Sequence, residues 1–402
     1  MALACYTLNY LYLRPVVLRT NPTVDFSCYY RSGKMVVSGA AAKIYDVSAQ
    51  RQYDRELQKE IAPGKWLEYR PFNYPPFVLL VFAPLSLLPY HQAELAWYSL
   101  NAAMLLSLPF TMLGILGRGK LLAYAVVAPA LFLPTEFALI QGQSSIMVLL
   151  ALGLVIAKLV EGNEGSAGCA LAIAMWKPQL ALPMLVALVF AARWRAVAGF
   201  LGASVALFLA SASMLGVRTT LGFPEAVLQF RRLPQGSGGD YPLAMPNIRG
   251  ISYLLLRTRF PDGILQPLIL VFSLALIILA AIAFKTQASR NLGLACALVV
   301  TVTVMTSYHC YLHDLSLLIL PFLLVAADVR WRGISAWPMV ALLAISAVFI
   351  VPFVSGAYQR SLLTFFAATV VLGTSLVMTM RGVPCHRPRG KIRGLTESPS
   401  LG

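Results

Sequence analysis

Long apolar runs separated by short polar joints make up most of the chain from residue 77 onward. Several of them reach the roughly 17–25 apolar residues that cross a bilayer as a helix. The runs lie at residues 77–90, 94–116, 121–138, 144–160, 167–176, 178–192, 196–216, 264–284, 292–307, 315–328, 335–353 and 361–380. This pattern predicts an all-α, multi-pass membrane protein with about 11–12 transmembrane or half-membrane helices.

Prolines and a lysine interrupt two of these stretches. The run 77–90 contains Pro84 and ends at Pro89, and Trp176-Lys177-Pro178 divides the stretch 167–192. Short or broken pieces of this kind are tolerated at membrane depth only where they face protein or a water-filled cavity. We therefore expect half-helices or re-entrant segments in these two places.

The first 75 residues differ from the rest. Residues 1–20 are only mildly apolar and are interrupted by two arginines, so either they form a short first helix or the gene starts further upstream. Residues 21–75 form a polar loop, in which the stretch 26–37 predicts a helix. The loop closes on Pro75-Pro76, which predicts extended backbone followed by a helix start.

Composition agrees with a membrane protein and narrows its partners. Hydrophobic residues make up 58% of the chain and charged residues only 12%, against about 25% charged residues in soluble proteins. The net charge is +16, and the basic residues cluster at joints and in the C-terminal tail. The positive-inside rule explains these clusters, and no motif of a nucleic-acid-binding module accompanies them, so we expect no nucleic acid partner. The six cysteines are scattered without metal-ligand spacing.

The basic joints predict an orientation. With Arg193–Arg195, Lys285–Arg290, Arg330–Arg332 and the tail 381–402 in the cytoplasm, three segments between the apolar runs lie outside: 217–262, 308–314 and 354–360. Residues 1–380 then form one membrane domain. An outer position is unusual for a cluster of arginines and indicates that some of them hold an anionic lipid headgroup; they are Arg231, Arg232, Arg249, Arg257 and Arg259.

Asp25 opens the polar loop where the chain leaves the membrane, within Asp25-Phe26-Ser27-Cys28-Tyr29-Tyr30-Arg31-Ser32-Gly33. An acidic residue at this place is a candidate catalytic base. The alternative is that Asp25 caps the helix that follows it.

Two further stretches carry polar residues between apolar runs. Lys177 interrupts an apolar run, and a charge at membrane depth indicates a function, for which a phosphate is the natural partner; the alternative is that it reaches an interface. Gln141-Gly142-Gln143-Ser144-Ser145 either caps the helix that begins at Ser145 or lines a polar cavity with amide groups.

Tyr308-His309-Cys310-Tyr311-Leu312-His313-Asp314 is the densest polar cluster between apolar runs and holds two of the four histidines. His313 beside Asp314 suits proton transfer or phosphate contact near neutral pH, whereas an interfacial aromatic belt is the alternative. The two histidines have helical spacing, but no third ligand is evident, which argues against a metal site. Pro246-Asn247-Ile248-Arg249-Gly250 precedes an amphipathic stretch, and Arg249 is either an anion ligand or a surface residue.

In their order along the chain these segments resemble the polyprenol-phosphate-dependent glycosyltransferases of family 87. The resemblance rests on the residues from Asp25 to Gly33 together with Gly39, Ile44-Tyr45-Asp46, Tyr74-Pro75-Pro76-Phe77, Phe82-Ala83-Pro84-Leu85, Leu88-Pro89, Ala96-Trp97, Gly142-Gln143, Lys177-Pro178, Arg193-Trp194-Arg195, Asn247, Arg249-Gly250, His313-Asp314-Leu315 and Pro321. Two departures are visible: the family has a clear membrane helix ahead of its acidic residue, and it often has Asn at the position of Ser145.

The resemblance implies a GT-C fold, with residues 21–75 as a first extracytoplasmic loop that carries juxtamembrane helices. It further implies that Asp25 is the base of a single inverting displacement, without a nucleotide sugar, a metal or another cofactor. Lys177, Arg249, His309 and His313 would stabilise the leaving phosphate, and Tyr74 and Gln143 would contact the donor.

The same resemblance implies a polyprenyl-phosphate-linked hexose as the donor, with mannose favoured, and a lipid or glycan as the acceptor. The enzyme would lie in the cell (inner) membrane among its lipids, with the active site on the extracytoplasmic face. Two other functions are compatible with the residues: a polytopic lipid or solute transporter, and a catalytically inactive GT-C relative. If Asp25 is not the base, Asp46 and Asp314 are the next positions to test.

Overall fold

The computed structural model describes residues 2–15, 25–61, 69–230, 232–233 and 241–332, together with the helical positions Phe366, Thr369, Val370, Gly373, Leu376 and Val377. The predicted run 335–353, the turn 354–360, most of the run 361–380, the tail 381–402 and Arg231 lie outside the described residues. Every regular element in the described ranges is helical. The prediction of an all-α protein is therefore confirmed for this part of the chain.

The N-terminal residues form a short helix, which was one of the two interpretations of this segment. Helix α1 (Ala2–Leu8) continues into a π-helical turn, η1 (Asn9–Leu13). The turn is fixed by buried polar groups, because Asn9 donates to Glu136 and Tyr98 donates to the carbonyl of Tyr6 at 2.7 Å.

Two helices make up the first polar loop. Helix α3 (Phe26–Val37) has the bounds that the sequence predicts, and after the short turn η2 (Ala41–Lys43) helix α4 (Val47–Ile61) begins. Asp46 starts α4 by accepting the backbone N–H of Ala49 at 2.7 Å, as an N-cap carboxylate does. The guanidinium of Arg31 on α3 donates to Asp54 on α4 at 2.8 Å, which joins the two helices.

The chain then enters the membrane body through short pieces, as the prolines predict. The pair Pro75-Pro76 leads into η3 (Pro76–Val78) and α5 (Leu79–Leu85), and α6 (Tyr90–Thr111) starts after Pro89. Helix α3 packs directly on α5: a Cβ added to Gly33 would lie 2.3 Å from the carbonyl oxygen of Phe82.

The apolar runs are helices, but most are shorter than a bilayer is thick. The run 121–138, expected as one piece, is bent by 56° between α8 (Lys120–Leu131) and α9 (Leu133–Gln141), where Pro134 starts the second helix. The break at Lys177 separates α11 (Glu164–Ala174) from α12 (Pro178–Phe190), as predicted. The other helices of the body are α7 (Leu113–Leu116), α10 (Ser145–Val160), α13 (Trp194–Leu215), α17 (Asp262–Gln287), α18 (Leu292–Thr306), η5 (Leu312–Leu318) and α19 (Ile319–Arg332).

Among the described residues, two helices, α13 and α17, are long and apolar enough to cross a membrane, and a third span results if the bent pair α8–α9 counts as one. In the described part of the chain, the expected transmembrane or half-membrane pieces are thus mainly short apolar helices packed around a common interior. A break in a helix leaves backbone N–H and C=O groups that need hydrogen-bond partners from protein or water. The breaks therefore mark where a polar interior has to be.

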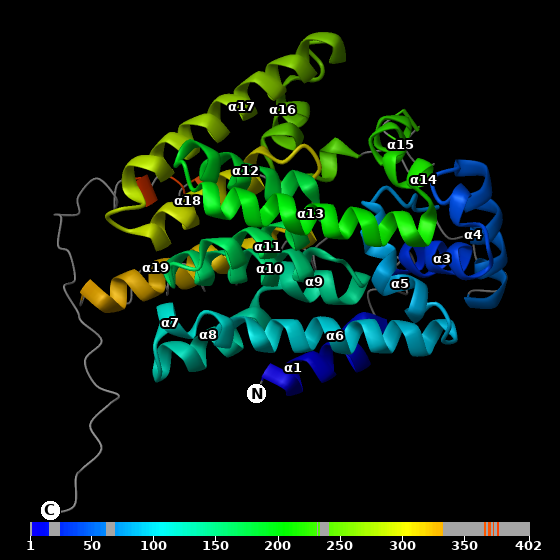
Figure 1. Cartoon of the computed structure of the whole chain (residues 1–402), viewed down its shortest axis with the longest axis horizontal. Coiled ribbons are helices and arrows are strands. Elements are labelled where there is room, and N and C mark those ends of the chain that lie inside the picture. Colours follow the sequence, from blue (N-terminus) through cyan, green and yellow to red (C-terminus); the bar gives the residue numbers. More distant parts are fainter. Residues whose placement is uncertain are drawn as a thin grey trace, which may run out of the picture.

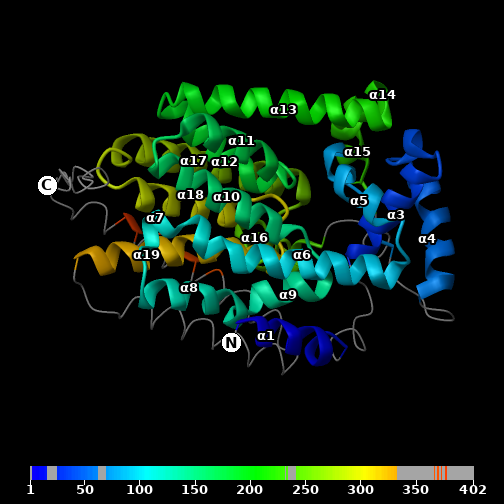
Figure 2. The same ribbon diagram turned by 60° about the horizontal axis from the view of Figure 1, so that its bottom comes forward.

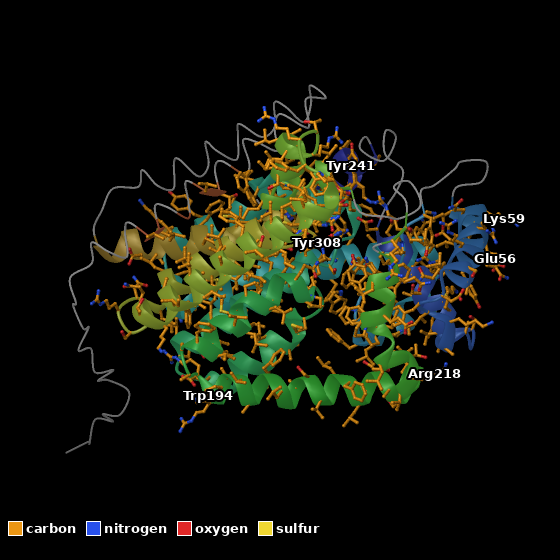
Figure 3. All side chains as sticks on the ribbon, turned by 90° about the horizontal axis from the view of Figure 1, so that it is seen from above. Glu56, Lys59, Trp194, Arg218, Tyr241 and Tyr308 are labelled. Atoms are coloured by element: carbon orange, nitrogen blue, oxygen red, sulfur yellow. The ribbon has the colours of Figure 1, made fainter. Side chains whose placement is uncertain are left out.

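The two large polar loops meet at one end of the molecule. The loop 217–262 folds into α14 (Val217–Leu221), α15 (Phe223–Phe230), η4 (Pro242–Ala244) and α16 (Ile248–Leu256). Helices α14 and α15 lie beside α3 and α4 in both ribbon views (Figures 1 and 2). Trp194, at the start of α13, lies at the opposite end from Arg218, Glu56 and Lys59 (Figure 3).

Candidate active site

Polar residues from four interruptions of the helical pattern meet in the interior. Asp25 precedes α3, Gln143 lies between α9 and α10, Lys177 lies between α11 and α12, and His313 and Asp314 belong to η5. Hydrogen bonds join these side chains into one polar network, which runs from Asp25 to His313. The sequence predicted each of these residues singly, and the structure brings them together.

The carboxylate of Asp25 does not cap its helix. Asp25 occupies the N-cap position of α3 without a side-chain bond to the backbone, so the capping alternative is wrong. Instead its Oδ2 accepts a hydrogen bond from Nε2 of Gln143 at 2.5 Å, and its Oδ1 lies 3.7 Å from Nε of Arg70. The side chain keeps 16% of its surface exposed, so this carboxylate is accessible to a substrate.

Gly142 brings Gln143 to this carboxylate. It ends α9 in the left-handed conformation, with φ at 64°, which favours glycine. A Cβ at this position would lie 2.7 Å from the Cβ of Phe26, the residue after Asp25. The loop between α9 and α10 therefore packs against the start of α3 only because residue 142 has no side chain. Its carbonyl accepts the indole N–H of Trp97 at 2.8 Å, which fixes it further.

The serines that follow do not cap α10 either. The N-cap Ser144 makes no side-chain capping bond; its hydroxyl lies 2.9 Å from that of Tyr29, while Ser145 donates to Oδ1 of Asp314 at 2.7 Å. The alternative interpretation of this motif, a polar cavity lined with amide groups, stays a prediction; the two serines contribute hydroxyl contacts that it did not include.

Lys177 uses all three of its N–H donors inside the protein. Its Nζ donates to Oδ1 of Asp314 at 2.6 Å, to Oγ of Ser145 at 2.9 Å and to Oε1 of Gln143 at 3.1 Å. An ammonium group has three donors, so a further ligand reaches it only by displacing one of these acceptors. The side chain is 4% exposed, so the alternative that Lys177 reaches an interface is wrong.

This arrangement also fixes the orientation of the Gln143 amide. Because Oε1 accepts from the ammonium of Lys177, Nε2 faces the carboxylate of Asp25. In the reverse orientation the amide N–H would face the ammonium of Lys177 and the amide oxygen would face the carboxylate of Asp25. Donor would then meet donor, and acceptor would meet acceptor. Gln143 thus couples the lysine to the exposed carboxylate.

Asp314 is the buried counterpart of Asp25. It is fully buried, and besides Lys177 and Ser145 it accepts the backbone N–H of Tyr311 at 3.0 Å. Burial by itself raises the pKa of Asp314, but the ammonium of Lys177 and the ring of His313, whose Nε2 lies 3.4 Å away, outweigh burial and hold the pKa well below its ordinary value. Asp314 is therefore an ionised partner of Lys177 and a poor base.

His313 extends the polar network beyond Asp314. Its Nδ1 lies 3.0 Å from Oε1 of Gln141. Burial lowers the pKa of His313 and Lys177 adds to this effect, while Asp314 opposes it. The imidazole is thus neutral near neutral pH and offers an N–H donor rather than a charge.

Arg249 and His309 lie at the edge of the polar network. The guanidinium of Arg249 stacks on the ring of Tyr308, with its carbon 3.7 Å from the ring centroid, and donates to the carbonyl of Tyr308 at 3.0 Å. Asn247 caps α16 and donates to the carbonyl of Ser307 at 2.7 Å. The motif around Arg249 therefore clamps the segment that leads to Asp314. His309 packs edge-on against Tyr311, with ring centroids 4.7 Å apart.

Two aromatic residues complete the wall next to Asp25. The rings of Tyr29 and Tyr74 are 4.8 Å apart, and the hydroxyl of Tyr29 lies 2.9 Å from that of Ser144. Burial raises the pKa of both phenols well above the ordinary value, so they stay neutral and keep their O–H donors. Tyr74, which the resemblance assigns to the donor, thus lies in the same polar interior.

Nothing in spacing or composition distinguishes Arg70 from the other charged residues of the first polar loop. Gln141, Ser145 and Asp314 belong to motifs that the sequence singles out, but the contacts of Gln141 with His313 and of Ser145 with Asp314 could not be predicted from it. Among the described residues, no group of three His, Cys, Asp or Glu side chains is placed to hold a metal ion.

The fold and the site define a helical membrane protein with an accessible carboxylate coupled to a buried lysine. The model of glycosyltransferase family 87 matches residues 72–307, which is more than half of the chain. The chain belongs to glycosyltransferase family 87, and it is a membrane glycosyltransferase. The matched range includes Tyr74, Gln143, Lys177 and Arg249. No curated protein and no solved structure matches the chain.

Proposed function

We propose that this glycosyltransferase transfers a hexose from a polyprenyl-phosphate-linked donor to a lipid or glycan acceptor, in one inverting displacement with Asp25 as the base. The observation that carries the proposal is the pair of hydrogen bonds that links Asp25 through Gln143 to Lys177. It places an accessible carboxylate and a cationic, hydrogen-bonding group at the two ends of one amide side chain.

Asp25 suits the role of base better than the other two carboxylates considered. Asp46 is engaged as the N-cap of α4, and Asp314 is fully buried and paired with Lys177. Asp25 takes the proton of an acceptor hydroxyl while the oxygen forms a bond to the anomeric carbon. The bond from that carbon to the phosphate oxygen breaks, and its electron pair leaves with the polyprenyl phosphate.

The distances suit an in-line displacement. A base within hydrogen-bond reach of the attacking oxygen lies roughly 6–7 Å from the leaving oxygen, which is on the far side of the carbon. Lys177 Nζ is at most about 8 Å from Oδ2 of Asp25, because a single amide group separates them. We infer that the phosphate leaves toward Lys177 and His313. Of the other residues expected at the phosphate, His309 would act from the neighbouring segment 307–311, and Arg249 would act from α16, where it contacts Tyr308 of that segment.

A lipid-linked donor fits the surroundings of this site. The polar network lies among apolar helices, and α13 and α17 are long enough to cross a membrane next to it. A polyprenyl chain would stay in the lipid while its phosphate reaches the polar interior. We propose mannose as the first sugar to test. We propose the extracytoplasmic face of the cell (inner) membrane as the location of the site, because Trp194, in the basic joint Arg193–Arg195, lies at the opposite end from Glu56 and Lys59 of α4 (Figure 3).

The test is transfer of radiolabelled mannose from polyprenyl-phosphate-mannose to a lipid extract by the purified protein, beside a parallel reaction with GDP-mannose. Transfer from the lipid-linked donor alone supports the proposal. Transfer from the nucleotide sugar alone contradicts it. Activity with a glucosyl or arabinosyl donor instead of mannose corrects the sugar, and a folded protein inactive with every donor is the catalytically inactive relative.

A further inference from the structure

We propose that Arg70 binds the acceptor, by donating to a hydroxyl next to the one that Asp25 deprotonates. The ligand class is a sugar or polyol with two neighbouring free hydroxyls. This inference rests on the proposed function and extends it from the donor to the acceptor.

Arg70 and Asp25 share the accessible part of the site. Nε of Arg70 lies 3.7 Å from Oδ1 of Asp25, and the two side chains are 35% and 16% exposed. By contrast, Lys177 and Asp314 are 4% and 0% exposed. A ligand that approaches Oδ1 of Asp25 therefore meets the guanidinium at the same time.

A buried network holds the backbone at Arg70 in place. The guanidinium of Arg31, which is 1% exposed, donates to the carbonyl of Arg70 at 2.8 Å. Tyr69, just before Arg70, and Phe72, two positions after it, both bind Oε1 of Gln50, which accepts the hydroxyl of Tyr69 and the backbone N–H of Phe72, each at 2.8 Å. Fixing the backbone lowers the entropy that the side chain loses when it binds a ligand. The position is therefore built to present this guanidinium at Asp25.

The reaction geometry assigns Arg70 to the acceptor rather than to the phosphate. In an in-line displacement the leaving oxygen lies roughly 6–7 Å from the base, on the far side of the reacting carbon. Arg70 is within salt-bridge distance of the base, so it lies on the near side, where the acceptor enters. Lys177 is one amide group further away, on the side of the leaving group.

The two groups match the chemistry of a diol. A carboxylate only accepts hydrogen bonds and a guanidinium only donates them. The first hydroxyl can therefore donate to Asp25 while its neighbour accepts from the planar fork of Arg70. This pair would fix the direction from which the attacking oxygen approaches the donor.

The experiment compares wild type, Arg70→Met, Arg70→Lys and Arg51→Met. Polyprenyl-phosphate-[14C]mannose is the donor and a dilution series of lipid extract supplies the acceptor. Label in lipid measures transfer, and free mannose measures hydrolysis of the donor by water. Arg51 is the matched control, because it is an arginine of the same polar loop whose guanidinium lies over the ring of Tyr69, the residue before Arg70, 5.1 Å from the centroid.

The expected result is that Arg70→Met raises the apparent KM for the extract about tenfold or more, as loss of a charge-assisted hydrogen bond does. Donor KM and donor hydrolysis should stay within about twofold of wild type, since water needs no second contact. Arg70→Lys should recover part of the loss, and Arg51→Met should behave as wild type.

Three results would overturn the inference while leaving the proposed function intact: equal loss of hydrolysis and transfer in Arg70→Met, a rise in its donor KM, or the same defect in Arg51→Met. The first and third would make Arg70 structural, and the second would place it at the phosphate. A wild-type protein that neither transfers from nor hydrolyses any polyprenyl-phosphate-linked sugar would refute the proposed function itself.

Discussion

Replacing Lys177 with Met tests the buried pair at the centre of the site. The change keeps a similar shape but removes the ammonium, and Asp314 is left fully buried with only its bonds from Ser145 and Tyr311 and the nearby ring of His313. Breaking a buried ion pair by removing one partner costs about 3–5 kcal/mol, because a charge stays behind without compensation. We expect a loss of this size in the free energy of unfolding.

The double variant Lys177→Met/Asp314→Asn should recover most of this loss. It removes both charges, and replacing a whole buried pair is often close to neutral. Asn at 314 still offers one oxygen to Ser145 or to the N–H of Tyr311. The double variant should therefore be about 2–4 kcal/mol more stable than Lys177→Met. Transfer should stay low in both variants, because the amide of Gln143 loses the group that orients it.

The pH dependence of the free energy of unfolding is a second, independent test of the buried pair. In wild type the depressed pKa of Asp314 contributes stability that is lost only when the pH falls well below about 4. In Lys177→Met, burial would raise the pKa of Asp314 above that of the unfolded chain, so the variant would lose stability as the pH rises. Its defect should be smaller at pH 5 than at pH 7.5.

The assay is equilibrium unfolding in mixed micelles, followed by the fluorescence of the six tryptophans, at both pH values. A single variant within about 1 kcal/mol of wild type at pH 7.5 would refute a fully buried pair. So would a double variant that is no more stable than the single one.

Two further substitutions probe the surroundings. Gly142→Ala should lower both stability and transfer more than Gly39→Ala, since both glycines have positive φ but only at Gly142 would a Cβ meet another residue within 4 Å; equal effects in unfolding and transfer assays would contradict this packing. Burial lowers the pKa of His313, so the unfolded chain binds its proton first and wild type should lose stability as the pH falls below about 6.5. His313→Gln should flatten that slope between pH 7.5 and 5.5, and an unchanged slope would show that another group causes it.

Much of the fold could be predicted from the sequence, because helical class follows from apolar runs and their breaks follow from proline. Helix α3 and the division at Lys177 are confirmed. The bend between α8 and α9 was missed: a run such as 121–138 looks continuous, and Pro134 stands where a proline is compatible with either a kink or a new helix.

The residues of the site could be predicted one by one, but not the hydrogen-bonded network that joins them. Asp25, Gln143 and Lys177 stood out because polar groups are costly among apolar runs. Their bonding could not be predicted, since it depends on Gly142 packing against α3, a contact across 116 positions in sequence. Arg70 was missed for a related reason: it is one of many charged residues in a polar loop, and only the network around Gln50 distinguishes it.

The most direct test of the account compares Asp25→Asn with Asp46→Asn in transfer from polyprenyl-phosphate-mannose, with wild type alongside. Both substitutions remove one carboxylate from the first loop, but only Asp25 lies at the site, while Asp46 caps α4. The account predicts that Asp25→Asn loses transfer by about 10²-fold or more, as expected for a missing general base, and that Asp46→Asn keeps transfer with a somewhat lower stability. Transfer by Asp25→Asn at the wild-type rate would contradict the account.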